Sequence, residues 1–162
     1  MREHNGKVYK ENAPHNMEEL LEIITVLRSP EGCSWDRAQT HESLKECLNE
    51  ESEEVLQAID KQDDENLCEE LGDLLMQVLV HCEIARERGA FDFSDVVQML
   101  SEKLIRRHPH VFGDVKQPET PEEALELWKE VKRIEKERKA TAGNSCHVSC
   151  GESVNRETEE HA

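Results

Sequence analysis

The chain has 162 residues, of which 36% are hydrophobic, and this length and composition predict one domain with a buried core. Its formal charge of −17 argues against binding to nucleic acid or anionic membranes through bulk electrostatics. The first sixteen residues are polar and charged, and no apolar run approaches the roughly 18 residues of a membrane span, so we expect neither a secretory signal nor a membrane anchor. Six cysteines lack a regular framework, which predicts reduced thiols in a cytoplasmic protein.

Apolar periodicity predicts five helices, in an all-α helical bundle. The expected ranges are 17–28, 41–61, 65–88, 95–107 and 121–139. A capping residue precedes each helix: Asn16, Thr40, Asp63 or Asp64, Ser94 and Thr120. We expect a flexible N-terminal arm over 1–15, the domain over 16–140, and a disordered tail over 141–162, where polar residues dominate.

The third predicted helix is expected to end at Gly89. The first is expected to end at the Ser29-Pro30-Glu31-Gly32 break. The polar loop that follows contains Trp35, whose large apolar side chain is unusual in such a setting. We favour a tryptophan that plugs the end of the bundle, and direct contact with a ligand is the alternative.

The stretch from Glu46 to Asp73 is the most acidic part of the chain, with twelve carboxylates and a single basic residue. Glu51 and Glu54 lie three residues apart on the second predicted helix, and Glu70 and Asp73 lie three apart on the third. Residues with this spacing share a helix face, so each pair directs two carboxylates the same way.

The acidic pairs coincide with the apolar stripes of their helices. At roughly 3.6 residues per turn, Glu51 falls inside the stripe of Leu44, Leu48, Val55, Ala58 and Ile59, and Glu54 falls at its edge. Glu70 falls inside the arc of Leu67, Leu71, Leu74, Val78 and Ile84, with Asp73 beside it. Carboxylates aimed at a core need a counter-charge, and all-oxygen ligands favour Mg²⁺, Mn²⁺ or Ca²⁺ over zinc. The pattern therefore predicts a central metal-binding helical hairpin, although acidic helix surfaces without a metal are common.

Two further residues of the third predicted helix stand out. Gly72 lowers local helix propensity by about 1 kcal/mol relative to alanine, and we expect the close approach of another helix to require it. His81 lies near the same arc, where we expect a hydrogen-bonded core or rim histidine.

The end of the fourth predicted helix is the one concentrated basic patch, formed by Lys103, Arg106, Arg107 and His108. Cations at a helix C-terminus are favoured by the helix dipole, and this structural role competes evenly with anion binding. The fifth predicted helix carries Trp128 and Lys132 one turn apart. In the tail, the segment 146–150 offers two cysteines and a histidine, which is weak evidence for zinc.

Several of these motifs, taken together, closely resemble MazG-type nucleoside triphosphate pyrophosphohydrolases. The resemblance covers about residues 17–138 and rests on the segments at 32–36, 39–40, 50–55, 70–75 and 106–112, in the family's order and spacing. Ser34 departs from the family's usual proline, which is expected to alter only loop rigidity. The chain also has one such unit, where some relatives have two in tandem.

The resemblance implies an all-α, Mg²⁺-dependent and typically dimeric enzyme that hydrolyses nucleoside triphosphates to the monophosphate and pyrophosphate. The implied metal ligands are Glu51, Glu54, Glu70 and Asp73. The implied nucleotide contacts are Lys103, Arg107, Trp128 and Lys132. Glu50 is implied as a nearby accessory acid, and either Glu50 or Glu54 is a candidate general base. Mn²⁺ is a possible substitute ion, and stacking on Trp128 would suit broad specificity in nucleotide-pool house-cleaning.

Two other classes of protein compete with this reading. A carboxylate-bridged di-iron bundle needs Glu-x-x-His motifs on paired helices, and none stands in register here. A non-catalytic acidic scaffold for a basic partner explains the net charge, but it leaves Lys103, Arg107 and Lys132 unexplained.

Overall fold

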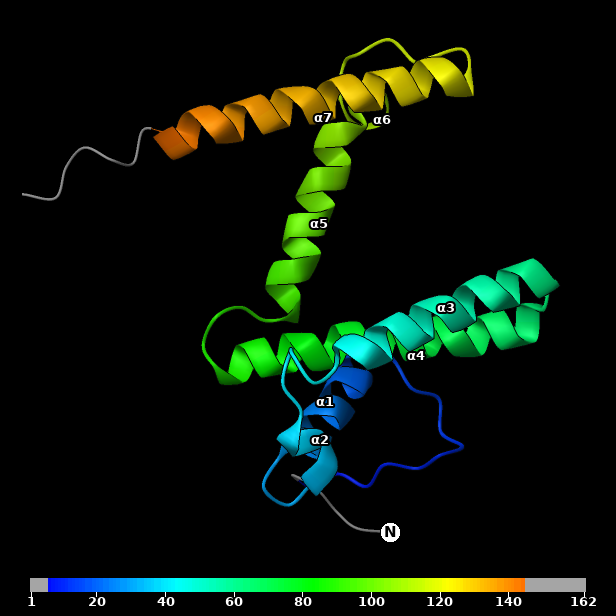
Figure 1. The fold of residues 1–162 in the computed structure, drawn as a ribbon, viewed down its shortest axis with the longest axis vertical. Coiled ribbons are helices and arrows are strands. Elements are labelled where there is room, and N and C mark those ends of the chain that lie inside the picture. Colours follow the sequence, from blue (N-terminus) through cyan, green and yellow to red (C-terminus); the bar gives the residue numbers. More distant parts are fainter. Residues whose placement is uncertain (1–5, 145–162) are drawn as a thin grey trace, which may run out of the picture. The chain divides into compact units, whose positions relative to one another are not determined.

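The computed structural model describes residues 6–144 of the protein, and this range is all-α, as the sequence predicts. Two compact units divide the chain, Met1–Met99 and Leu100–Ala162 (Figure 1). None of the helices within residues 6–144 has the long apolar run that a membrane crossing requires. The cysteines in this range, Cys33, Cys47, Cys68 and Cys82, are free thiols, as expected, and the cysteine-histidine segment of the tail lies outside the described residues.

Helix α1 spans Met17–Arg28, and its predicted bounds are confirmed. The Asn16 side chain accepts a hydrogen bond of 2.9 Å from the backbone N–H of Glu19, which satisfies one of the free donors of the first turn. In the segment before the helix, Lys7 lies 2.7 Å from Glu22, so this part of the predicted arm contacts α1.

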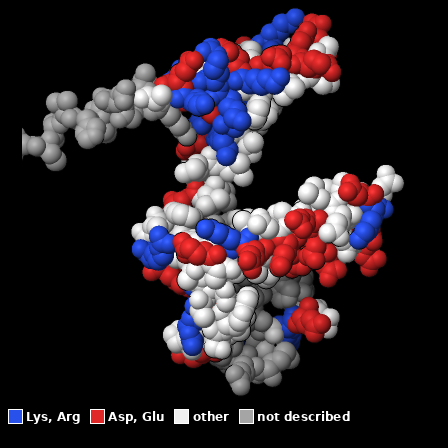
Figure 2. All heavy atoms as spheres, in the orientation of Figure 1, with Lys and Arg blue, Asp and Glu red and all other residues white. Residues whose placement is uncertain are grey.

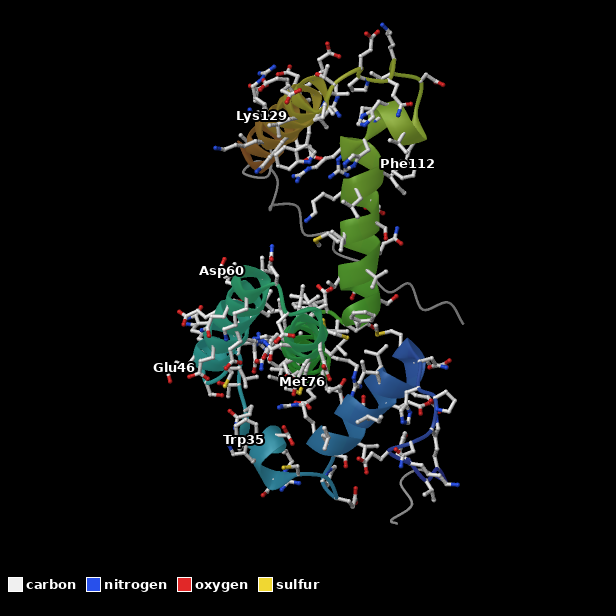
Figure 3. All side chains as sticks on the ribbon, turned by 90° about the vertical axis from the view of Figure 1, so that its right-hand side faces the viewer. Trp35, Glu46, Asp60, Met76, Phe112 and Lys129 are labelled. Atoms are coloured by element: carbon white, nitrogen blue, oxygen red, sulfur yellow. The ribbon has the colours of Figure 1, made fainter. Side chains whose placement is uncertain are left out.

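A short helix, α2 at Ser34–Ala38, stands where the sequence predicts a loop. Gly32 allows the turn between α1 and α2, because a Cβ at this position would lie 2.1 Å from the carbonyl oxygen of Val26. Trp35 is 59% exposed and projects from α2 (Figure 3). The favoured expectation of a plug at the end of the bundle is therefore wrong within the described chain, because the short helix turns this side chain outward.

Helix α3 spans Lys45–Lys61 and begins four residues later than predicted. Thr40 and Ser43 cause the delay, since the N–H of each donates to the other's hydroxyl oxygen, at 2.9 and 3.2 Å, and holds residues 41–44 in a turn. The helix ends at Gln62, which adopts the left-handed conformation (φ 54°). Asp63 follows, and its side chain caps α4 by accepting from Asn66 N–H, which reverses the chain within two residues.

Helix α4 spans Asp64–Glu87 and packs antiparallel against α3 (Figure 1). It ends in a Schellman motif at Gly89, as expected, with φ 66° and an N–H of Ala90 that donates to Ala85 O at 3.0 Å. The core of the first unit comprises Ile24, Leu44, Ala58, Leu79, Cys82, Ile84 and Ala85. The α4 residues of this core all come from the second half of the helix.

Some residues of the predicted buried arcs are exposed. They are Ile59 at 51%, Leu71 at 49% and Val78 at 39%. The helical wheel identifies the apolar face of each helix. In the structure, α3 and α4 cover only part of each other's apolar face, and α1 covers a further part of α4. The expected helix contact at Gly72 is also wrong, because a Cβ there would meet nothing within 4 Å except the backbone of its own helix, among the residues that the structure describes.

Helix α5 spans Phe93–Arg107 and crosses the boundary between the units. Asp92 caps it in place of the predicted Ser94, in a reciprocal pair of hydrogen bonds with Asp95 at 3.0 and 3.1 Å. The short α6, Pro109–Phe112, is an addition to the predicted helices. Helix α7 spans Pro121–Asn144, so helix continues through 141–144, which the sequence assigns to the tail.

Gly32 and Gly72 make a matched pair for a stability test. Gly32→Ala should lower the free energy of unfolding by more than about 2 kcal/mol, because its methyl group would collide with backbone oxygens. Gly72→Ala should raise it by up to about 1 kcal/mol, because the site is exposed, helical and uncrowded. Urea unfolding followed by circular dichroism measures both, and a destabilised Gly72→Ala protein would contradict the exposed position.

Candidate metal centre

Three carboxylates meet on the α3–α4 hairpin. Glu51 lies on α3, and Glu70 and Asp73 lie on neighbouring turns of α4. Each offers one oxygen, and these three oxygens lie within 4.8 Å of one another. All three residues are half-buried. The antiparallel packing of the two helices thus brings together residues that are about twenty positions apart in the chain.

The electrostatics of this carboxylate cluster are unfavourable without a counter-ion. Burial, followed by the charges of Asp73, Glu54 and Glu70, raises the pKa of Glu51 above its usual range. Burial, followed by the charges of Glu54, Glu69 and Asp73, raises the pKa of Glu70 in the same way, and a hydrogen bond from Asn66 opposes the shift. Desolvation and like charge both disfavour the ionised form, and a bound cation would remove the second cause.

The other two predicted acids lie outside the group of three. Glu54 is exposed, yet its charge acts on both Glu51 and Glu70, so it stands at the border of the cluster. Glu50 is exposed on α3. The hairpin therefore gathers three of the four predicted ligands and leaves the fourth within electrostatic reach.

The donor set fits a hard divalent cation. Carboxylate oxygens are the ligands that Mg²⁺, Mn²⁺ and Ca²⁺ prefer, and a partly open site leaves coordination positions for water or a phosphate oxygen. The half-buried state of the cluster is consistent with such access.

A histidine pair joins α4 to the turn that precedes α3, with His81 on α4 two turns beyond Asp73. The Nδ1 atoms of His41 and His81 are 2.8 Å apart, and the two rings stack with centroids separated by 5.1 Å. His81 is thus hydrogen-bonded, as expected, but the sequence reasoning missed His41 as its partner. The available signal was position, since His41 is the first residue of the second predicted helix, which carries Glu51.

In the second unit, two basic residues lie near the ring of Trp128 on α7. The guanidinium carbon of Arg107 lies 5.5 Å from the ring centroid, and the Nζ of Lys132 lies 4.8 Å from it. These distances allow cation–π attraction on the tryptophan ring. The remaining predicted contact, Lys103, is half-buried on α5, one turn before Arg107.

Glu135 is an ion-pair partner that the sequence reasoning missed. It accepts two hydrogen bonds from Arg107, at 2.7 and 3.0 Å, and one from Arg106 at 2.6 Å. Hydrogen bonds from Arg107, and then from Arg106, lower the pKa of Glu135 to about 2. The signal in the sequence was the spacing, because Glu135 lies one turn beyond Lys132.

On the face drawn in Figure 2, basic side chains gather in the second unit and acidic ones along the α3–α4 hairpin.

The histidine pair predicts a stability change in mild acid. Burial, and then the charge of His41, lowers the pKa of His81 below its usual 6.5. The unfolded chain therefore takes up this proton first as the pH falls, so the stabilisation is complete above about pH 6.5 and is lost as the pH falls towards the folded pKa. Urea titrations between pH 5 and 8 should show this loss in the wild type and not in His81→Phe. An exposed control, His15→Ala, should keep the wild-type slope, and parallel profiles for His81→Phe would contradict the assignment.

Comparison with known proteins identifies relatives of this chain. A family profile described as the MazG nucleotide pyrophosphohydrolase domain matches residues 39–112. The chain is 54% identical over 125 residues to the nucleoside triphosphate pyrophosphohydrolase/pyrophosphatase MazG of Thermotoga maritima, an alignment that covers 77% of this chain and 47% of that protein. It is 44% identical over 127 residues to the nucleoside triphosphate pyrophosphohydrolase of Escherichia coli K12, with 78% and 48% covered. The chain thus spans about half the length of the curated relatives it matches.

A solved structure extends the comparison over nearly all of another protein chain. The crystal structure of a MazG-related protein from Thermotoga maritima superposes with a TM-score of 0.59 at 38% identity, and the match covers 72% of this chain and 99% of that one. Since the similarity includes both acidic helices, the chain belongs to the MazG nucleotide pyrophosphohydrolase domain family.

Proposed function

We propose that the protein hydrolyses nucleoside triphosphates to the monophosphate and pyrophosphate in a Mg²⁺-dependent reaction, with broad specificity suited to nucleotide-pool house-cleaning. The observation that carries the proposal is the carboxylate cluster of Glu51, Glu70 and Asp73, three oxygens within 4.8 Å on a hairpin of this family. The proposal is also supported by relatives of about twice the length that are named nucleoside triphosphate pyrophosphohydrolases.

The four predicted ligands, Glu51, Glu54, Glu70 and Asp73, would hold the ion, and Mn²⁺ is the expected substitute. A bound divalent cation offsets phosphate charge and can activate a water for attack at the α–β linkage. Glu54 is exposed and its charge acts on Glu51 and Glu70, and Glu50 is exposed and adjacent to Glu51 in the chain, so either carboxylate could take a proton from an attacking water.

The proposed nucleotide contacts are the four residues that the family resemblance implies, Lys103, Arg107, Trp128 and Lys132. Lys103, Arg107 and Lys132 would offset the phosphate charge that remains, which lets an acidic protein bind an anionic substrate. Trp128 would stack on the base or ribose. Arg107 is already paired with Glu135, so its guanidinium is oriented by that carboxylate and a phosphate would compete for its charge.

One assay separates this proposal from a non-catalytic acidic scaffold. The protein is incubated with a panel of purine and pyrimidine triphosphates, with Mg²⁺ or with chelator, and monophosphate and pyrophosphate are measured. Equal amounts of both products, formed only with the metal, support the pyrophosphohydrolase. Absence of turnover for every triphosphate, together with binding to a basic protein, would favour the scaffold.

We also propose a homodimer in the cytoplasm, and exposed apolar side chains on the hairpin support the self-association. Leu56, Ile59 and Leu71 are between 49% and 60% exposed, which is unusual for large apolar residues of a packed helix pair. In the sequence, Leu75, Leu79 and Cys82 extend the apolar arc of the third predicted helix, which favours a dimer, but Leu79 and Cys82 are core residues of the first unit. The proposed contact therefore uses the outer face of the hairpin.

The ligand role of Asp73 can be tested by Asp73→Asn. This variant should lose activity by more than about 100-fold, beyond the 10–100-fold typical of residues that only support a ligand. Its free energy of unfolding without metal should equal or exceed that of the wild type, because one repelling charge is removed. Asp60→Asn, an exposed change on α3, is the control and should keep full activity. Wild-type turnover by Asp73→Asn would exclude the assignment.

The phosphate role of Arg107 can be separated from a structural one. Loss of a charge-assisted contact of roughly 1.5–3 kcal/mol should lower kcat/KM of Arg107→Ala at least about tenfold, equally for purine and pyrimidine triphosphates. Trp128→Ala should instead show a penalty that depends on the base. Arg106→Ala removes the other partner of Glu135 and should keep kcat/KM within about twofold. If Arg107→Ala lowers only the melting temperature, the ion pair with Glu135 is its whole role.

The oligomeric state can be measured by light scattering at micromolar concentration. We expect twice the chain mass of 18.7 kDa. A single-chain mass under these conditions would count against the homodimer and leave the exposed apolar residues without a partner.

A further inference from the structure

Gln77 on α4 is a buried polar residue that the proposed reaction does not use. Its side chain is 4% exposed, and its Oε1 atom finds no hydrogen-bond donor within residues 6–144. A buried acceptor without a donor is costly, so a native fold that retains one is expected to supply a partner from outside the chain.

The position of Gln77 connects it to the carboxylate cluster. It follows Asp73 by four residues and Glu70 by seven, so all three lie on one face of α4. Across the hairpin, Glu51 is the carboxylate that the side chain of Gln77 affects, since Gln77 opposes the upward shift of the pKa of Glu51 that burial and Asp73 cause. An ionised carboxylate only accepts hydrogen bonds, so the amide Nε2 faces Glu51 and Oε1 is the atom left over.

We propose that Gln77 is a positioning residue of the metal centre: Nε2 donates to Glu51 and fixes the orientation of that carboxylate, while Oε1 accepts a hydrogen bond from a water bound to the cation. The proposal rests on the metal centre of the proposed function. Mg²⁺ keeps several of its waters when it binds to proteins, and the protons of those waters need acceptors. Groups behind a ligand that fix its orientation commonly contribute to metal affinity.

A purely structural role for Gln77 makes different predictions. If the side chain only fills space beneath the hairpin, an apolar residue of similar length changes the stability of the protein and leaves its affinity for metal unchanged. If Oε1 accepts a hydrogen bond from a metal-bound water, the same change removes an unpaired acceptor from the metal-free protein and weakens the binding of the ion.

The experiment titrates the full chain, without nucleotide, with Mn²⁺ under electron paramagnetic resonance and with Mg²⁺ by calorimetry. Gln77→Met keeps the length of the side chain and removes both polar atoms, and Gln77→Leu is a second variant in case the first does not fold. Gln57→Leu makes the same chemical change at an exposed position of α3 and is the matched control. The melting temperature of each protein is measured with and without the metal.

We expect Gln77→Met to weaken Mn²⁺ binding about 10- to 100-fold and to shrink the rise in melting temperature on metal addition, with no loss of metal-free stability. Under turnover, the variant should need more Mg²⁺ for half-maximal rate and recover much of its kcat when Mg²⁺ is saturating. A Mn²⁺ affinity within about twofold of the wild type, in either folded variant, would overturn the role of Gln77 alone. Failure of the wild type itself to bind Mn²⁺ or Mg²⁺ would overturn the metal centre as well.

Discussion

The mutual repulsion of Glu51, Glu70 and Asp73 is the constraint around which the first unit is built. The packing of α3 on α4 places one oxygen of each within 4.8 Å of the others, and burial raises the pKa of the two glutamates further. Such an arrangement is unfavourable for the fold and useful for a cation, because the same charges that repel one another attract the ion. The rest of the hairpin has to hold the carboxylates together against this repulsion.

Helix α4 divides this work between its two halves. The ligands lie in its first half, whereas its fully buried residues, among them Leu79, Cys82 and Ala85, lie in its second half. The second half is also tied to α1, since the buried Arg28 donates two hydrogen bonds of 2.8 Å to Glu87. The same guanidinium donates to the carbonyl oxygens of Asp36 and Gln39, so one side chain joins α1, α4 and the α2 segment. Core packing at one end of the helix thus allows a charged site at the other.

In the second unit, the charges that lie close together are positive. Arg106 and Arg107 are adjacent cations, and Glu135 of α7 accepts hydrogen bonds from both, which holds the end of α5 against α7. The ring of Trp128 lies within cation–π distance of both Arg107 and Lys132. The ion pair with Glu135 and the proposed anion-binding role of Arg107 are compatible. The guanidinium has five N–H donors, and the carboxylate that orients it leaves some of them available to a ligand.

The sequence by itself determined the all-α class, the bounds of α1, the cap at Asp63, the stop at Gly89 and the acidic pairs, because each depends on spacing within a few residues. Tertiary structure decided what spacing cannot report. It turned Trp35 outward, left Leu71 and Gly72 exposed, and placed Glu54 at the border of the carboxylate cluster. It also formed the pairs His41–His81 and Arg107–Glu135, whose partners come from different elements. A helical wheel identifies a face, but which part of that face is covered depends on the lengths and crossing of the neighbouring helices, and these are set only when the whole chain packs.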